Sequence, residues 1–198
     1  MKNTAFRWLG RSLVVVAAAL ASACADGKPV GPADATTARG VTALADVTDG
    51  NRLPELPAGC ERLAPKPGST LVLKAFGVGV QIYHWNGLSW GAATPAATLY
   101  ADAERQGVVA DHFAGPTWKS NSGGTVLGTL ANRCIVDPSA IPWLLLNGFP
   151  EGPGIFEKVA FIQRLNTVGG NAPSTAGTVI GQEARVPYTA DYLFYQAP

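Results

Sequence analysis

The segment Gly87-Leu88-Ser89-Trp90-Gly91 matches the G-x-S-x-G pattern that carries the nucleophilic serine of α/β-hydrolases. Such an enzyme needs an acid and then a histidine later in the chain, and Asp102 or Asp111 followed by His112 has that order. The pattern works only where a strand turns sharply into a helix. Here the serine follows a predicted hairpin turn, and Pro95 interrupts the next segment. We therefore do not expect a serine hydrolase.

A metal site built on histidine is a second possibility. His84 and His112 are the only histidines in the sequence, and Asp111 is adjacent to the second of them. Neighbouring residues of a strand point to opposite faces, so Asp111 and His112 cannot readily bind one ion. Catalytic zinc usually takes three protein ligands. We predict no metal site and interpret the histidines as structural; the alternative is a hydrolase or metal-dependent enzyme centred on His112.

The segment from His112 to Trp118 places an imidazole, a Gly-Pro turn and an indole close together. Such a turn can line a pocket, to which Gln163, Arg164 and Asn166 could add polar groups. The alternative is that these polar side chains satisfy buried backbone groups at a corner of a sheet. The candidate ligand-binding residues from this comparison are His112, Trp118 and Arg164.

Asn86-Gly87 lies between two apolar segments, which is the strongest short signal for a hairpin with a two-residue type I′ turn. This turn would place Tyr83 opposite Trp90. The resulting aromatic face could stack on a flat ligand or a sugar, so Tyr83 and Trp90 join the ligand-binding candidates. The alternative is that both belong to the core, where cross-strand aromatic pairs stabilise a sheet.

Two further signals are weak. Gly77-Val78-Gly79 lacks the third glycine and the following helix of a dinucleotide-binding loop, and is more typical of a bend in a strand. Asp191 lies among Tyr188, Tyr192 and Tyr195 and could be catalytic. A hydrogen bond to a neighbouring strand is the simpler role for its carboxylate.

Strand-like segments cover most of the chain after residue 56. Gly and Pro separate them at intervals of about ten residues, as in sandwiches and barrels. Residues 155–167 fit a helix face or a strand, and flanking glycines favour the strand. The sequence predicts one mainly β domain over 56–198, an antiparallel sandwich or barrel. The other expected strands are 71–76, 80–85, 108–113, 126–136, 141–146 and 186–195.

Residues 1–23 have the pattern of an export signal. An apolar run over 13–21 is much shorter than the roughly 20 residues that span a bilayer, and three basic residues precede it. Cys24 follows small residues, so we expect it to be lipidated as a membrane anchor, with cleavage and secretion as the alternative. Residues 24–55 are rich in Ala, Thr, Gly, Asp and Pro, which predicts a flexible tether. The basic residues are Lys2, Arg7 and Arg11.

The net charge argues against one class of partner, and the cysteine content fits an exported protein. Without residues 1–23 the chain has 12 basic and 14 acidic side chains, a net charge of −2, which argues against nucleic acid as a partner. If Cys24 is lipidated or lies in the tether, Cys60 and Cys134 remain as a pair. Exported compartments favour a disulfide between them; the alternative is two buried free thiols. No CxxC motif is present, so neither a redox nor a zinc cluster is indicated.

Five segments together resemble the domain of unknown function 3455 family of exported bacterial and fungal proteins, in order over about Leu56 to Tyr195. The resemblance implies no established activity. It does imply a disulfide between a cysteine soon after the QIY segment and a cysteine after GGxAP. In this sequence those regions read His84-Trp85 and Ser174-Thr175-Ala176, so that disulfide is absent. A Cys60–Cys134 disulfide would be a substitute for it. The five segments are GVQIY (79–83), HFAGPTW (112–118), IPWLLL (141–146), FIQRLNT (161–167) with GGNAP (169–173), and VPYTADY (186–192).

These observations favour a non-enzymatic binding or structural β domain at the cell envelope, held by a flexible tether. The sequence implies no cofactor and no catalytic residue. Its expected partners are the membrane, through an acylated Cys24, and an unidentified small molecule, glycan or envelope protein.

Overall fold

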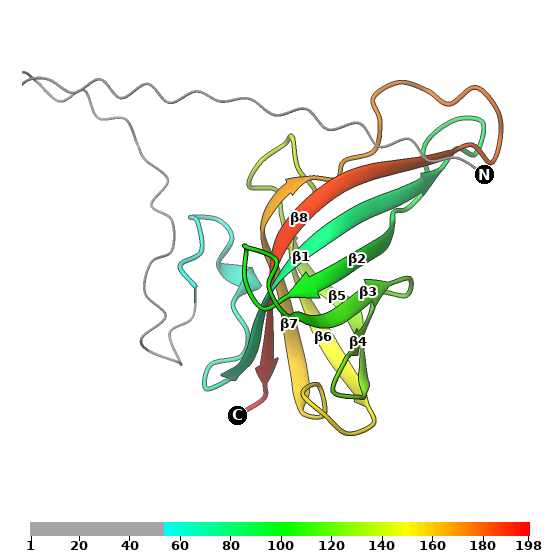
Figure 1. Ribbon diagram of the computed structural model, residues 1–198. Coiled ribbons are helices and arrows are strands. Elements are labelled where there is room, and N and C mark those ends of the chain that lie inside the picture. The colour runs from blue at the N-terminus through cyan, green and yellow to red at the C-terminus, as the bar shows by residue number, and fades with distance from the viewer. Residues whose placement is uncertain (1–53) are drawn as a thin grey trace, which may run out of the picture. The chain divides into compact units, whose positions relative to one another are not determined.

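The chain forms a closed barrel of eight antiparallel strands in a computed structural model that describes residues 54–198 (Figure 1). A short 3-10 helix, η1 (Glu61–Leu63), precedes the barrel. The strands are β1 (Thr70–His84), β2 (Thr94–Tyr100), β3 (Val108–Phe113), β4 (Thr117–Ser120), β5 (Thr125–Cys134), β6 (Trp143–Glu151), β7 (Val159–Gly169) and β8 (Glu183–Gln196).

Closure of the barrel comes from the first and last strands. Each strand pairs with the next one along the chain, and β8 pairs with β1, so the sheet has no free edge. The β1–β8 ladder extends from Thr70 opposite Gln196 to His84 opposite Glu183. Figure 1 shows these two long strands side by side along one wall of the barrel.

The core fills the lumen because alternate residues of each strand point inward. On β8 the inward residues are Tyr188, Ala190, Tyr192 and Phe194, and all four are buried. A glycine on the neighbouring strand makes room for one of these rings. A Cβ at Gly77 would lie 2.6 Å from the Tyr192 ring, so β1 can pass this ring only without a side chain there.

Residues 54–65, here called the strap, pack on the outer face of the barrel. Cys60 and Leu63 of the strap are buried in a second apolar cluster with Leu145, Leu165 and Leu193. Gln163 lies beneath the strap: its Nε2 donates to the Leu63 carbonyl at 2.7 Å, and its Oε1 accepts from the Tyr195 hydroxyl at 2.7 Å. The outer face of β6 to β8 is therefore a second buried interface.

The barrel has two different ends. At one end, called the pocket end, lie the connections β1–β2, β3–β4, β5–β6 and β7–β8 (residues 85–93, 114–116, 135–142 and 170–182). The start of β1 and the end of β8 lie at the other end. Within residues 54–198, no helix has the length and apolar character needed to span a bilayer.

Most expectations about the fold are confirmed. The domain is all-β and antiparallel, and of the two predicted architectures it adopts the barrel. Strand β3 has the expected bounds, and the ambiguous segment 155–167 is a strand from residue 159. Strands β2 and β4 were not predicted. The expected signal peptide, the lipidation of Cys24 and the tether up to residue 53 lie outside the described residues.

The predicted turn at Asn86-Gly87 is wrong. Trp85 pairs with Trp90, so the turn between these two residues has four residues, 86–89. Tyr83 therefore does not lie opposite Trp90. A type I′ turn needs a positive φ at both central residues, and only Gly87 has one, 99°. The Asn86 side chain instead accepts hydrogen bonds from the amides of Leu88 and Ser89, at 2.9 and 2.8 Å, which stabilises the wider turn.

The two segments where the family resemblance suggests a bridge still meet without cysteines. Trp85 packs directly on Gly177, where a Cβ would lie 2.5 Å from the indole ring. Trp90 contacts Trp85 edge to face, with ring centroids 5.4 Å apart, and its Nε1 donates to the Thr175 carbonyl at 3.0 Å. A tryptophan pair thus joins the β1–β2 and β7–β8 connections.

The predicted disulfide between Cys60 and Cys134 is confirmed, with Cα atoms 5.6 Å apart and a sequence separation of 74 residues. Replacing both cysteines by serine, in a Cys24→Ser background that prevents thiol exchange, is expected to lower the free energy of unfolding by roughly 4 kcal/mol, because the unfolded chain gains the entropy of an open loop. Chemical denaturation measures the change.

Reductant provides the control for this prediction. It should destabilise the Cys24→Ser protein to the level of the triple variant and should leave the triple variant unchanged. Equal stability of the oxidised protein and the triple variant would contradict the prediction.

Candidate functional site

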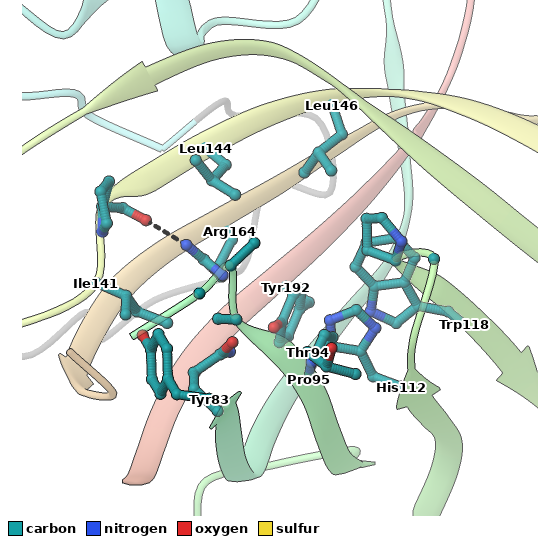
Figure 2. A pocket seen from close by; sticks show the side chains of 17 residues that line it. Tyr83, Thr94, Pro95, His112, Trp118, Ile141, Leu144, Leu146, Arg164 and Tyr192 are labelled. Atoms are coloured by element: carbon teal, nitrogen blue, oxygen red, sulfur yellow. Dashed lines mark hydrogen bonds between the residues drawn. The ribbon is translucent and has the colours of Figure 1, made fainter. Parts of the chain in front are cut away.

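A cavity of about 460 Å³ lies at the pocket end of the lumen. Its rim comes from residues 91–93, 115–116 and 141–142 of three connections. This volume falls in the range of known small-molecule sites. Figure 2 shows the lining side chains. Thr94 contributes from the start of β2, and the other strand residues of the lining occupy inward positions: Gln81, Tyr83, Pro95, His112, Trp118, Leu144, Leu146, Arg164 and Tyr192.

His112 and Trp118 form one wall of the cavity. They are cross-strand partners on β3 and β4, and their rings stack with centroids 4.1 Å apart and planes 4° from parallel. Tyr192 meets both rings edge to face. The wall has room because Gly128 of β5 carries no side chain: a Cβ there would lie 2.9 Å from the Trp118 ring.

The imidazole of His112 is neutral. Burial lowers its pKa to about 4, with a smaller contribution from the Arg164 charge, while the hydrogen bond to the Thr117 carbonyl opposes the shift. Nδ1 lies 3.0 Å from that carbonyl. A carbonyl only accepts, so Nδ1 carries the proton and Nε2 is left as an acceptor.

Arg164 supplies the positive charge of the cavity. Its Nη2 donates to the Pro142 carbonyl at 2.8 Å, which fixes the guanidinium beside the rim. Its Nε is buried and meets no acceptor in the described part of the chain. Burial raises the pKa values of Tyr83 and Tyr192, and in both cases the Arg164 charge opposes the shift. The cation is therefore near both hydroxyls.

The rim beside Arg164 is fixed by the β5–β6 connection. The Ile141 amide donates to the Gly169 carbonyl at 2.9 Å, and the Ile141 carbonyl accepts from Thr167. The Tyr83 hydroxyl donates to the Gly170 carbonyl at 2.6 Å. These bonds position the connection and the end of β7 around the guanidinium.

Two more buried donors of lining residues have no acceptor within residues 54–198, namely Trp118 Nε1 and Gln81 Nε2. Burial raises the pKa of Tyr188, with Tyr192 adding to the shift; Gln81 is close enough to oppose it but makes no hydrogen bond to this hydroxyl. Buried polar groups are normally hydrogen-bonded. Together with Arg164 Nε, the cavity residues thus carry three buried donors without acceptors in this part of the chain.

The structure brings together four of the five predicted ligand-binding residues. Tyr83, His112, Trp118 and Arg164 all line the cavity. Trp90 does not line it and lies instead against Trp85, outside the lumen. Tyr83 fits both interpretations offered for it, because its side chain is buried and also lines the cavity.

The residues of the hydrolase hypothesis do not meet. Ser89 is exposed in the β1–β2 connection, and Asp111 is exposed on the outer face while His112 points inward. Asp102 lies in the β2–β3 connection, at the end of the barrel away from the pocket. Within the described range 54–198, no three His, Cys, Asp or Glu side chains cluster closely enough to hold a metal ion.

Two polar residues expected near the pocket face outward instead. Gln163 is buried under the strap, and Asn166 donates from Nδ2 to Asp191 at 2.8 Å. Asp191 also lies 3.9 Å from Lys74 Nζ on the outer face, so its carboxylate bonds to neighbouring strands. Of the polar group 163–166, only Arg164 reaches the cavity.

Several cavity residues were missed by sequence reasoning. Thr94 and Pro95 belong to β2, which was not predicted because proline and alanine weaken its strand pattern. Leu144, Leu146 and Tyr192 sit in motifs that were recognised. Counting alternate residues inward from a neighbouring core position would have found them.

The sequence profile of the DUF3455 family, a family of proteins of unknown function, matches residues 65–196. The chain belongs to the DUF3455 family. The match covers all eight strands and therefore the whole pocket, but it begins after Cys60. No curated protein sequence and no solved structure matches the chain.

The buried histidine of this DUF3455 barrel predicts acid sensitivity. The folded state keeps His112 neutral down to about pH 4, whereas an unfolded histidine protonates near 6.5. The unfolded state therefore binds more protons between these values. The free energy of unfolding should fall as pH drops from about 6.5 to about 4, by on the order of 3 kcal/mol from this residue.

Denaturant unfolding at several pH values measures this loss. His112→Phe, which keeps a ring against Trp118, should show a flatter profile over the same window. His84→Gln at the exposed second histidine is the matched control and should keep the wild-type profile. Parallel profiles for wild type and His112→Phe would disprove the assignment.

Proposed function

We propose that this domain is a binding module that takes up one small organic ligand at the pocket end of its barrel. The observation that carries the proposal is the cavity of about 460 Å³, whose lining combines apolar and aromatic side chains with a few polar ones. An eight-stranded barrel can be filled completely by its own side chains or can hold one small ligand. The cavity favours the second, because the lining side chains leave room for a small molecule.

A non-enzymatic role agrees with the arrangement of the side chains. Nucleophilic catalysis needs a nucleophile within hydrogen-bond reach of a base. The one hydrogen bond of His112 within the described residues goes to the Thr117 carbonyl, and its ring is stacked on Trp118. The alternative is a hydrolase or metal-dependent enzyme centred on His112. The position of His112 in the cavity lining favours it, but within residues 54–198 no metal-binding cluster lies there and neither Ser89 nor Asp111 reaches the imidazole.

The location of the module is part of the proposal. The Cys60–Cys134 disulfide suggests an extracytoplasmic site, since disulfides persist in oxidising compartments. We propose export through residues 1–23 and attachment to the membrane through a lipid on Cys24, with release after cleavage as the alternative. The ligand would then be captured at the cell envelope or outside it.

N-phenyl-1-naphthylamine, an uncharged dye that fluoresces in apolar sites, tests the binding function. We expect one dye per protein and saturable binding to the folded domain. Leu144→Trp fills the cavity and should weaken binding roughly ten-fold or more by steric exclusion. Leu127→Trp is the matched control, because Leu127 faces outward on β5 and is 41% exposed.

The control variant should bind as the wild type does. Absence of saturable binding, or equal binding by Leu144→Trp, would argue against the pocket as a ligand site. Circular dichroism shows whether each variant keeps the β fold.

A broad screen of ester, glycoside and peptide substrates tests the enzymatic alternative. We expect no turnover that depends on Ser89 or His112, because neither residue lies near the other groups that catalysis would need. The comparison is wild type against Ser89→Ala and His112→Ala. Turnover that disappears in either variant, at unchanged thermal stability, would favour the enzyme.

A further inference from the structure

The residues that line the cavity carry a positive charge and no negative charge. Arg164 is the single charged side chain among the lining residues, because His112 is neutral there. The ion pairs of residues 54–198 join Lys74 to Asp191 and Arg185 to Glu183, and neither involves the cavity. Arg164 is partly buried and forms no ion pair within residues 54–198, so a ligand that brings a negative charge would gain more here than an uncharged one of the same shape.

The guanidinium is positioned for such a group. Pro142 accepts from Nη2 and fixes the side chain, which remains partly exposed. A guanidinium has five N–H donors in a planar fork that matches a carboxylate. In Figure 2 the group points into the cavity between Leu144 and Tyr83.

The rest of the lining is suited to an apolar body. Ile141, Leu144 and Leu146 line one side, and the His112–Trp118 stack lies across Tyr192 from Arg164 (Figure 2). A ligand with an acid group at one end and a flat or aliphatic body at the other would match both halves.

We infer that the pocket binds an organic carboxylate with an apolar body and that Arg164 binds the carboxylate. This inference rests on the proposed binding function and narrows its ligand class. It predicts selection by charge among ligands of equal shape.

The pair 1-naphthoate and 1-naphthamide tests it by calorimetry at neutral pH, since the two differ mainly in charge. Wild type should bind the acid more tightly than the amide. Arg164→Met should lower the affinity for the acid roughly 10- to 100-fold, because a hydrogen bond to a charged group is lost, and should leave the amide within about two-fold. Arg164→Lys keeps the charge and should restore part of the acid affinity.

Arg185→Met is the matched control, because Arg185 is exposed on the outer face of β8. It should change neither affinity. Equal binding of acid and amide by wild type overturns the inference, and so does an equal loss of both in Arg164→Met, which would indicate a structural role.

The two proposals fail in different ways. If the naphthylamine dye binds in the pocket but naphthoate does not bind better than the amide, the anion inference fails alone. If neither the dye nor either naphthalene compound binds, the binding function fails and the inference fails with it.

Discussion

Pairing of β1 with β8 is the interaction on which the rest of the structure depends. It closes the sheet and so creates a lumen with an inner and an outer face. Inside, Phe194 and Phe156 pack in the part of the lumen away from the rim together with residues of the other strands, whereas Tyr192 lines the cavity. Towards the pocket end the side chains of the facing strands leave a cavity between them. The pocket is thus a product of closure combined with uneven filling.

Much of the fold could be predicted from the sequence because strand alternation and glycine or proline breaks are local signals. Strand β3 is a short, largely apolar segment between turn signals and was predicted with its bounds. Strand β2 was missed because Thr-Pro-Ala-Ala has little strand propensity; pairing with β1 and β3 stabilises it nonetheless. The turn at Asn86 was misread because a side-chain hydrogen bond decided its geometry, which the dipeptide rule ignores.

Residues of the candidate site could be predicted where a recognised sequence motif contains a residue that points into the barrel. His112, Trp118 and Arg164 were found because each belongs to a recognised segment, but Gln163 and Asn166 were grouped with Arg164 from proximity in sequence alone. Alternation places Gln163 on the opposite side of the barrel wall from Arg164. Asn166 would share the face of Arg164 by alternation, but the register shift between Leu165 and Val168, with a φ of 49° at Asn166, turns its side chain outward. Trp90 was misplaced for a different reason, since its position depended on the register of the turn. Neither the empty space nor the absent acceptors could be read from residue types.

The strap gives the barrel a particular response to mechanical load. Cys134 lies at the pocket end of β5, and Cys60 is bonded to it before the chain continues to β1. A pull on the chain ahead of Cys60 therefore reaches the barrel through a covalent bond to β5. The force bypasses the β1–β8 ladder, whose hydrogen bonds would otherwise open one pair at a time from the Thr70 end. If the domain is held through the chain before Cys60, a pulling force can leave the β1–β8 pairing intact. The barrel then stays closed and the pocket keeps its shape.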